Sequence, residues 1–148
     1  MYLLQTARRS EHCCCRSPEL ATNWISQEFE THFPESGDVI AVGYSSGAIF
    51  AETLLSVAPE LFAAAVLLRP EPLSLGFSFP AMPAKRILIV AGKRDERRRH
   101  DDAAVLAEQL HSAEAIVSLH VIDAGHGWAQ DDGDIASARS WLATLAAA

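Results

Sequence analysis

Residues 37–52 read GDVIAVGYSSGAIFAE, and this stretch decides the fold of the chain. The apolar, β-branched run at 39–42 predicts a strand that is buried on both faces. After Gly47 the apolar residues recur at spacings of three and four as far as Pro59, which is the pattern of a helix with one buried face. The stretch therefore predicts a central strand that passes through a tight turn into a helix.

Ser45 lies at that turn, between Gly43 and Gly47. The short glycine–serine–glycine pattern is weak by itself because it also arises by chance. A strand before it and a helix after it are the context of a nucleophile elbow, in which the serine projects from a strained turn. Because neither glycine has a Cβ, we expect both to let strand and helix approach closely. The backbone N–H of Ser46, at the helix N-terminus, would then point toward an oxyanion.

Three further segments have the composition of buried strands: 62–69, 85–92 and 115–123. Helical patterns at 101–113 and 134–148 alternate with them, and the prolines of 70–84 predict a loop. This alternation predicts an α/β fold of three layers, in which helices flank a mostly parallel sheet of about four strands. Upstream we expect an amphipathic helix over 19–33. Residues 1–18 would form an irregular tail before a domain that spans 19–148.

The composition indicates one globular domain, since the chain has 148 residues of which 49% are hydrophobic. A formal net charge of −7 argues against nucleic acid as a partner, because no basic surface dominates. The sequence contains neither an apolar run of transmembrane length nor the pattern of a signal peptide, so we expect a cytoplasmic protein.

The three cysteines are consecutive, at Cys13, Cys14 and Cys15. Zinc ligands are separated along the chain and need further partners, and a disulfide framework also needs separated cysteines. We therefore expect neither a metal site nor a disulfide framework.

Two polar residues follow later predicted strands at the edge where ligands bind in an open parallel sheet. Asp95 follows the strand predicted at 85–92, and His126 follows the strand predicted at 115–123, in a loop with a glycine on each side. The order serine, aspartate, histidine is the one expected after a nucleophile elbow. A neutral imidazole takes the proton of the serine hydroxyl, and a carboxylate holds the tautomer of that imidazole. The pattern therefore predicts a catalytic triad of Ser45, Asp95 and His126.

Two alternatives stay open at this edge. Asp123, on the last predicted strand, is a substitute for Asp95 as the acid. The run Arg97, Arg98, Arg99 and His100 is most simply a solvated loop before a helix, but it is also a candidate site for an anionic substrate.

Four segments together resemble the carboxylesterase/phospholipase branch of the α/β-hydrolase superfamily, near its dienelactone-hydrolase-like members. These segments are VIAVGYSSGAIFAETLL (39–55), AAVLLRPE (64–71), RILIVAGKRD (86–95) and VIDAGHGWAQDD (121–132). The resemblance implies an esterase that acts on small carboxylic esters without a cofactor. It also implies that Ser45 is the nucleophile, Asp95 the orienting acid and His126 the base.

The N-terminal part departs from that family, whose members place several strands before the elbow and take a second oxyanion N–H from a loop there. The 36 residues before Gly37 contain no glycine and do not resemble that half. We therefore expect a partial α/β-hydrolase fold whose exposed sheet edge, at 39–42, favours homo-oligomers. We also expect weak ester hydrolysis, with Ser46 as the oxyanion donor.

Two other functions remain alternatives on the sequence. One is a non-catalytic hydrolase remnant that binds a ligand or a partner chain through the same cleft. The other is an unrelated doubly wound binding domain, in which Asp95 and His126 would lie far from Ser45.

Overall fold

The computed structural model describes Asn23, Ser26, Gln27 and residues 39–146. Of the helix predicted over 19–33, Asn23, Ser26 and Gln27 are described, and all three are helical. The predicted tail at 1–18, with its cysteines, lies outside the described residues.

Strands and helices alternate along the described chain. In order they are β1 (Ile40–Tyr44), α2 (Ser46–Val57), the 3₁₀ turn η2 (Pro59–Leu61), β2 (Ala64–Leu68), β3 (Arg86–Gly92), α3 (Asp102–Ser112), β4 (Ile116–Ile122) and α4 (Gly133–Ala146). These elements confirm the predicted strands and helices, with small shifts at their ends. Pro59 was expected to end a helix and also opens η2, a position where its missing N–H costs nothing.

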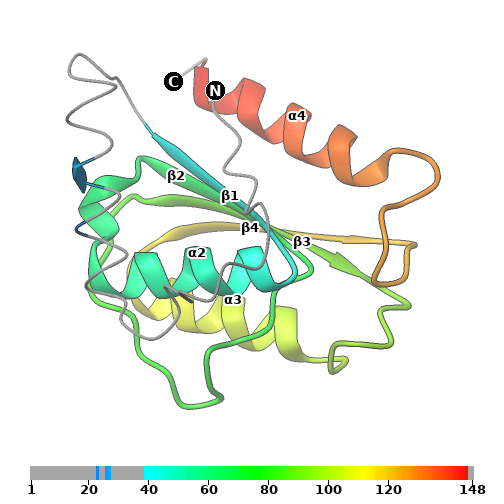
Figure 1. Ribbon diagram of the computed structural model, residues 1–148, viewed down its shortest axis with the longest axis horizontal. Coiled ribbons are helices and arrows are strands. Elements are labelled where there is room, and N and C mark those ends of the chain that lie inside the picture. Colours follow the sequence, from blue (N-terminus) through cyan, green and yellow to red (C-terminus); the bar gives the residue numbers. More distant parts are fainter. Residues whose placement is uncertain (1–22, 24–25, 28–38, 147–148) are drawn as a thin grey trace.

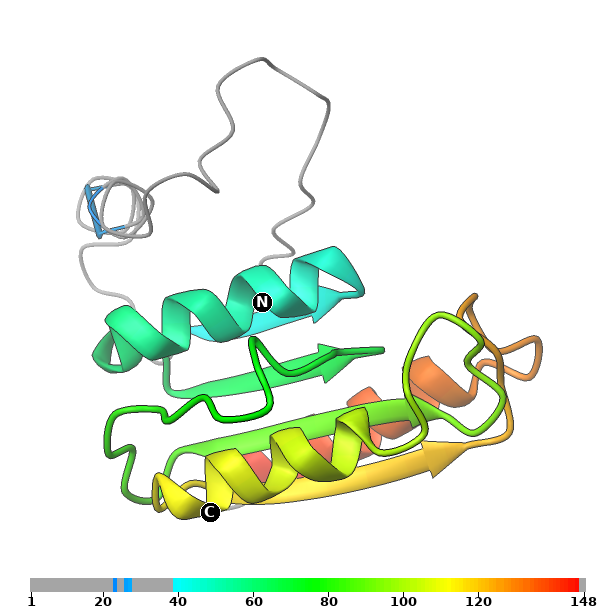
Figure 2. The same cartoon turned by 90° about the horizontal axis from the view of Figure 1, so that it is seen from below.

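The strands form one parallel sheet in the order β1-β2-β3-β4. Helices α2 and α3 cover one face of this sheet, and α4 covers the other (Figure 1). The turned view shows the same three layers: α2 and α3 lie in front of the sheet, and α4 lies behind it (Figure 2). The predicted three-layer α/β fold is confirmed.

The core explains why β2 and β3 are apolar at almost every position. Successive side chains of a strand point to opposite faces. Leu67 and Ile89 accordingly pack in the cluster that includes Leu54 of α2. Their neighbours Val66 and Leu88 pack in a second cluster with Trp141 of α4. Because helices cover both faces, neither face of these strands tolerates polar side chains.

The sheet has an edge at β1. Among the described residues β1 pairs with β2 alone, so its other side offers backbone N–H and C=O groups without a described partner.

None of the described helices combines the length and the apolar character that crossing a membrane requires.

Candidate active site

The turn between β1 and α2 holds Ser45 in a strained backbone conformation. Its φ is 54° and its ψ is −115°, a region that residues with a Cβ rarely occupy. The N–H of Ser45 donates to the carbonyl oxygen of Leu68 at 2.8 Å, and its own carbonyl oxygen accepts from the N–H of Ala48 at 2.9 Å. Bonds from β2 and from the first turn of α2 therefore hold the strained turn expected of an elbow.

The two glycines beside Ser45 differ in their roles. A Cβ built on Gly43 would lie 2.3 Å from the carbonyl oxygen of Gly47, so the first turn of α2 passes directly over Gly43. A Cβ on Gly47 would meet no described atom within 4 Å. The expectation that a missing Cβ is needed for the close approach is therefore correct for Gly43 and wrong for Gly47, whose Cβ position has no neighbour within 4 Å in the part of the chain that the structure describes.

Ser45, His126 and Asp95 lie in a hydrogen-bonded chain, although they come from the ends of three different strands. The Oγ of Ser45 is 2.9 Å from Nε2 of His126. Nδ1 of His126 is 3.0 Å from each carboxylate oxygen of Asp95. With Nδ1–H donating to Asp95, the unprotonated Nε2 accepts the hydroxyl proton of Ser45. The alternative of an unrelated binding domain, which requires these residues to lie far apart, is wrong.

The burial and the contacts of Asp95 and Asp123 show which of these two candidate acids lies beside His126. The side chain of Asp95 is 3% exposed and that of His126 is 9% exposed. The side chain of Asp123 is 76% exposed and forms an ion pair with Arg94 at 2.9 Å. The structure thus brings Asp95, and not Asp123, to His126.

Ser46 begins α2 and is exposed. Its backbone N–H finds no backbone acceptor among the described residues, as is usual for the first donors of a helix. This N–H lies directly after Ser45, where a helix N-terminus favours negative charge.

Sequence reasoning missed Arg69, which holds the loop of His126. This buried arginine donates from Nε to the carbonyl oxygen of Gly125 at 2.9 Å and from Nη2 to that of Gly127 at 3.4 Å. The two carbonyls belong to the residues on either side of His126. A single charged residue at the end of an apolar strand was the available signal, but the two loop carbonyls that it binds are more than fifty positions away in the sequence.

Tyr44 supports the same loop from β1. Its hydroxyl donates to the carbonyl oxygen of His126, and its ring stacks on Trp128 with centroids 4.7 Å apart. Burial raises the pKa of Tyr44 above its usual value, so the hydroxyl keeps the proton that it donates.

Arg98 departs from the predicted solvated loop. Its Nη2 lies 3.2 Å from Oγ of Ser45, its Nη1 lies 3.0 Å from Oε2 of Glu71, and its side chain is 13% exposed. Arg97, Arg99 and His100 are exposed, as that interpretation predicts. The sequence pattern did not distinguish Arg98 from the arginines beside it.

Glu52, on α2, is fully buried, and neither of its carboxyl oxygens has a hydrogen-bond partner among the described residues. Burial raises the pKa of Glu52 to about 9, the negative charge of Glu71 adds to this effect, and the positive charge of Arg98 opposes it. The Glu52 carboxyl group is therefore protonated at neutral pH.

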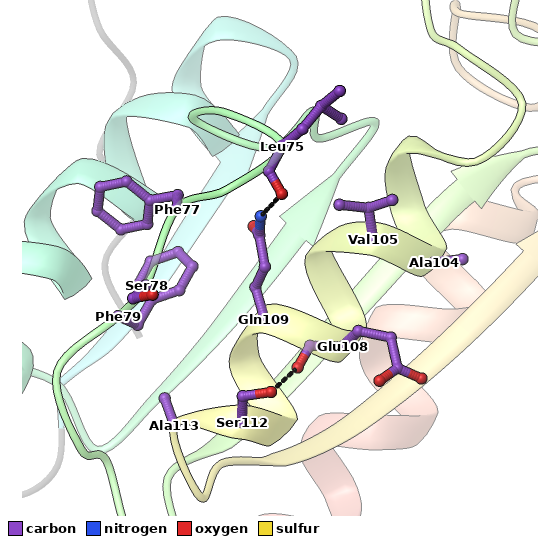
Figure 3. A pocket seen from close by; sticks show the side chains of 10 residues that line it. All are labelled: Leu75, Phe77, Ser78, Phe79, Ala104, Val105, Glu108, Gln109, Ser112 and Ala113. Carbon is purple, nitrogen blue, oxygen red and sulfur yellow. Dashed lines mark hydrogen bonds between the residues drawn. The ribbon is translucent and has the colours of Figure 1, made fainter.

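Two surface hollows lie beside the loop that follows β2, and Ser45, Asp95 and His126 line neither of them. The larger has a volume of about 460 Å³. Figure 3 shows Leu75, Phe77 and Phe79 of the loop opposite Val105 and Gln109 of α3. The smaller, of about 250 Å³, reaches Glu71, the ion-pair partner of Arg98.

A parallel sheet between two helical layers, with a serine at a strained strand–helix turn, defines the class of α/β hydrolases. The dienelactone hydrolase family model matches residues 20–147. The chain belongs to the dienelactone hydrolase family.

The relatives are similar over most of this chain. "Putative hydrolase MhqD" of Bacillus subtilis (strain 168) is 33% identical over 119 residues, which are 80% of this chain and 58% of MhqD. The protein Atu2452 of unknown function from Agrobacterium tumefaciens str. C58 is 30% identical, with a TM-score of 0.74, over 95% of this chain and 70% of its own. A carboxylesterase from Mesorhizobium loti is 30% identical, with a TM-score of 0.66, over 84% of this chain and 57% of its own. The chain thus spans about three-fifths of the length of the curated relative it matches.

Proposed function

We propose that the chain is a serine hydrolase that cleaves small carboxylic esters, with its hydrolase domain over 19–148. The observation that carries this proposal is the continuous hydrogen-bond chain from Ser45 Oγ through His126 to Asp95. The distances are those at which an imidazole takes a proton from a hydroxyl group.

The acylation step follows from this geometry. Ser45 Oγ forms a bond to the ester carbonyl carbon while its proton passes to Nε2 of His126. The π electron pair of the carbonyl moves to its oxygen, and the N–H of Ser46 donates to that oxyanion. When the pair returns, the bond to the alcohol oxygen breaks and His126 gives its proton to the leaving alcohol.

Deacylation repeats these moves with water. His126 takes a proton from the water molecule as the water oxygen attacks the acyl-serine carbon, and it returns the proton to Ser45 as the acid leaves. Asp95 holds the imidazole tautomer and stabilises its protonated form throughout. These steps use the side chains of the triad, one backbone N–H and water.

The relatives support hydrolase chemistry. The family model is one of hydrolases, and the carboxylesterase from Mesorhizobium loti is 30% identical to this chain. No observation favours the non-catalytic alternative, which is kept as an outcome of the test.

The test compares the purified chain with Ser45→Ala, using p-nitrophenyl butyrate hydrolysis and labelling by a fluorophosphonate probe. We expect both signals in the wild-type chain and neither in the variant. A wild-type sample that circular dichroism shows to be folded, but that neither turns over ester nor takes the label, would identify a non-catalytic remnant.

Substitutions of Asp95 and Asp123 test which aspartate orients His126. Asp95→Asn should lower kcat by about 10⁴-fold, because the asparagine amide stabilises the wrong imidazole tautomer. Asp123→Asn should leave kcat within about two-fold, because its exposed ion pair with Arg94 lies outside the triad. Equal losses in the two variants would contradict the role of Asp95.

A further inference from the structure

The guanidinium group of Arg98 is fixed in place beside the reactive serine. Its Nε donates to the carbonyl oxygen of Arg69 at 2.9 Å, and its Nη1 donates to Glu71 at 3.0 Å and to the carbonyl oxygen of Arg97 at 3.2 Å. Its Nη2 donates to Ser45 Oγ at 3.2 Å. A donor that is held by other bonds before the reaction needs no reorganisation during it.

The donors of Arg98 can be counted. A guanidinium carries five N–H groups, and four of those of Arg98 have the acceptors just described. The remaining N–H belongs to Nη2, the nitrogen that contacts Ser45, and it has no acceptor among the described residues. One charged N–H therefore remains available next to the atom that attacks the ester.

We propose that Arg98 is a catalytic residue, whose Nη2–H groups donate to the negative charge that develops where Ser45 attacks the substrate carbonyl. This inference rests on the proposed ester hydrolysis. It gives the site a second donor beside the backbone N–H of Ser46, and this donor comes from a part of the chain that follows the elbow.

The role follows from the order of bond formation. As the proton leaves Ser45 for His126, negative charge develops on Oγ, which Arg98 already contacts. When Oγ bonds to the carbonyl carbon, that charge moves to the carbonyl oxygen, which is separated from Oγ by one carbon atom. A guanidinium within hydrogen-bond distance of Oγ stays close to the charge at both positions, and it neither gains nor loses a proton because it remains charged.

The arrangement fits this role better than recognition of a carboxylate on the substrate. Bidentate binding of a carboxylate uses two parallel N–H groups, and on Arg98 a single N–H is without an acceptor among the described residues. Glu71 lies on the same guanidinium, so a second carboxylate there would meet a like charge.

The experiment measures kcat and KM for wild type, Arg98→Met and Arg98→Lys on two p-nitrophenyl esters, one with a neutral acyl chain and one whose acyl chain ends in a carboxylate. We expect Arg98→Met to lower kcat by about 10²- to 10³-fold on both esters with little change in KM, as for the loss of an oxyanion donor. Arg98→Lys should lower kcat by a smaller factor, because lysine keeps the positive charge although it lacks the planar fork of the guanidinium. Arg94→Met is the matched control, since Arg94 pairs with an exposed aspartate, and it should match wild type.

A second measurement separates chemistry from loop structure. Free guanidinium ion, added to Arg98→Ala at concentrations that leave the protein folded, should restore part of kcat. A purely structural arginine would give no such recovery, and that result would overturn the proposal.

The remaining outcomes are distinct. A loss confined to the anionic ester would make Arg98 a substrate-recognition residue, and a change in kcat of less than about three-fold, small beside the expected loss, would remove it from the chemistry. An increase in kcat would mean that Arg98 blocks the site. A wild-type chain that is inert toward esters and fluorophosphonate would instead refute the proposed function itself.

Discussion

Arg69 and Asp134 form a buried, two-pronged ion pair, in which Nη1 lies 2.6 Å from Oδ1 and Nη2 lies 3.1 Å from Oδ2. Their side chains are 0% and 1% exposed. Asp134 also accepts from the N–H of Ala129 at 2.7 Å. Because Arg69 binds the backbone on both sides of His126, the pair connects the end of β2, the histidine loop and the start of α4.

Asp134→Asn should therefore weaken both the fold and the site. Removing one partner of a buried ion pair leaves the other charge uncompensated, which typically costs about 3–5 kcal/mol in the free energy of unfolding. We expect a loss of that size in urea unfolding, and a fall in kcat because the loop of His126 loses its anchor. The control is Asp132→Asn, an exposed position before the same helix, which should change neither. Equal stability of the two variants would show that the buried pair does not hold the loop.

The fold and the close approach of Ser45, His126 and Asp95 were predictable because they rest on local patterns. The apolar runs of β1 to β4 and the helical spacing after Gly47 are written in consecutive residues. The prediction of a triad also used the general property that residues after parallel strands meet at one edge of the sheet. Asp95 and His126 are found in this way without knowledge of any contact.

Arg69, Arg98 and Glu52 were not predictable in the same way, because their roles depend on partners that are distant in sequence. Arg98 stands in a run of arginines, and only the fold shows which of them turns toward Ser45. Glu52 lies on an otherwise amphipathic helix, and only the packing shows that its carboxyl group is buried. The expected role of Gly47 failed for a similar reason, since the path of the helix decides which of two glycines is crowded.

Replacing Gly43 or Gly47 by alanine should change the stability of the protein in opposite directions. Gly43→Ala places a Cβ 2.3 Å from the carbonyl oxygen of Gly47, so strand or helix must shift, and we expect a loss of about 3 kcal/mol or more. Gly47→Ala places a Cβ where no described residue lies within 4 Å, at a helical position without positive φ, and it should stabilise the protein by about 0.5–1 kcal/mol. Thermal unfolding of the two variants checks both signs. Comparable melting temperatures would contradict the difference in crowding.

The edge at β1 predicts self-association. Its outer side has no strand partner among the described residues, and such an edge pairs readily with another chain. We expect the mass from light scattering to rise with protein concentration. Over the same range, amide hydrogen exchange should slow in peptides that contain Ile40–Tyr44, and peptides from β2 serve as the internal reference. A monomeric mass at every concentration would refute this prediction.

Glu52 makes the stability of the protein depend on pH. Its pKa rises from the ordinary 4.5 to about 9 on folding, so the folded chain holds a proton that the unfolded chain releases. Below pH 4.5 both states are protonated and the group has no effect on stability. Between pH 4.5 and about 9 the free energy of unfolding falls by up to about 1.4 kcal/mol per pH unit, and above that range the loss stays constant.

Glu52→Met removes this dependence because its side chain has a similar volume and no proton to lose. By linkage the variant should gain about 3 kcal/mol over wild type at pH 7 and more at pH 8, while the two should converge near pH 5. Urea unfolding at several pH values measures the gain, and Glu108→Met, at an exposed position of α3, provides the control with an unchanged slope. If wild type and Glu52→Met gave parallel curves of stability against pH, Glu52 would have to be ionised in the folded protein. Its two carboxylate oxygens would then need donors beyond those of the described residues, since a buried charge without hydrogen bonds is far more costly than a buried neutral acid.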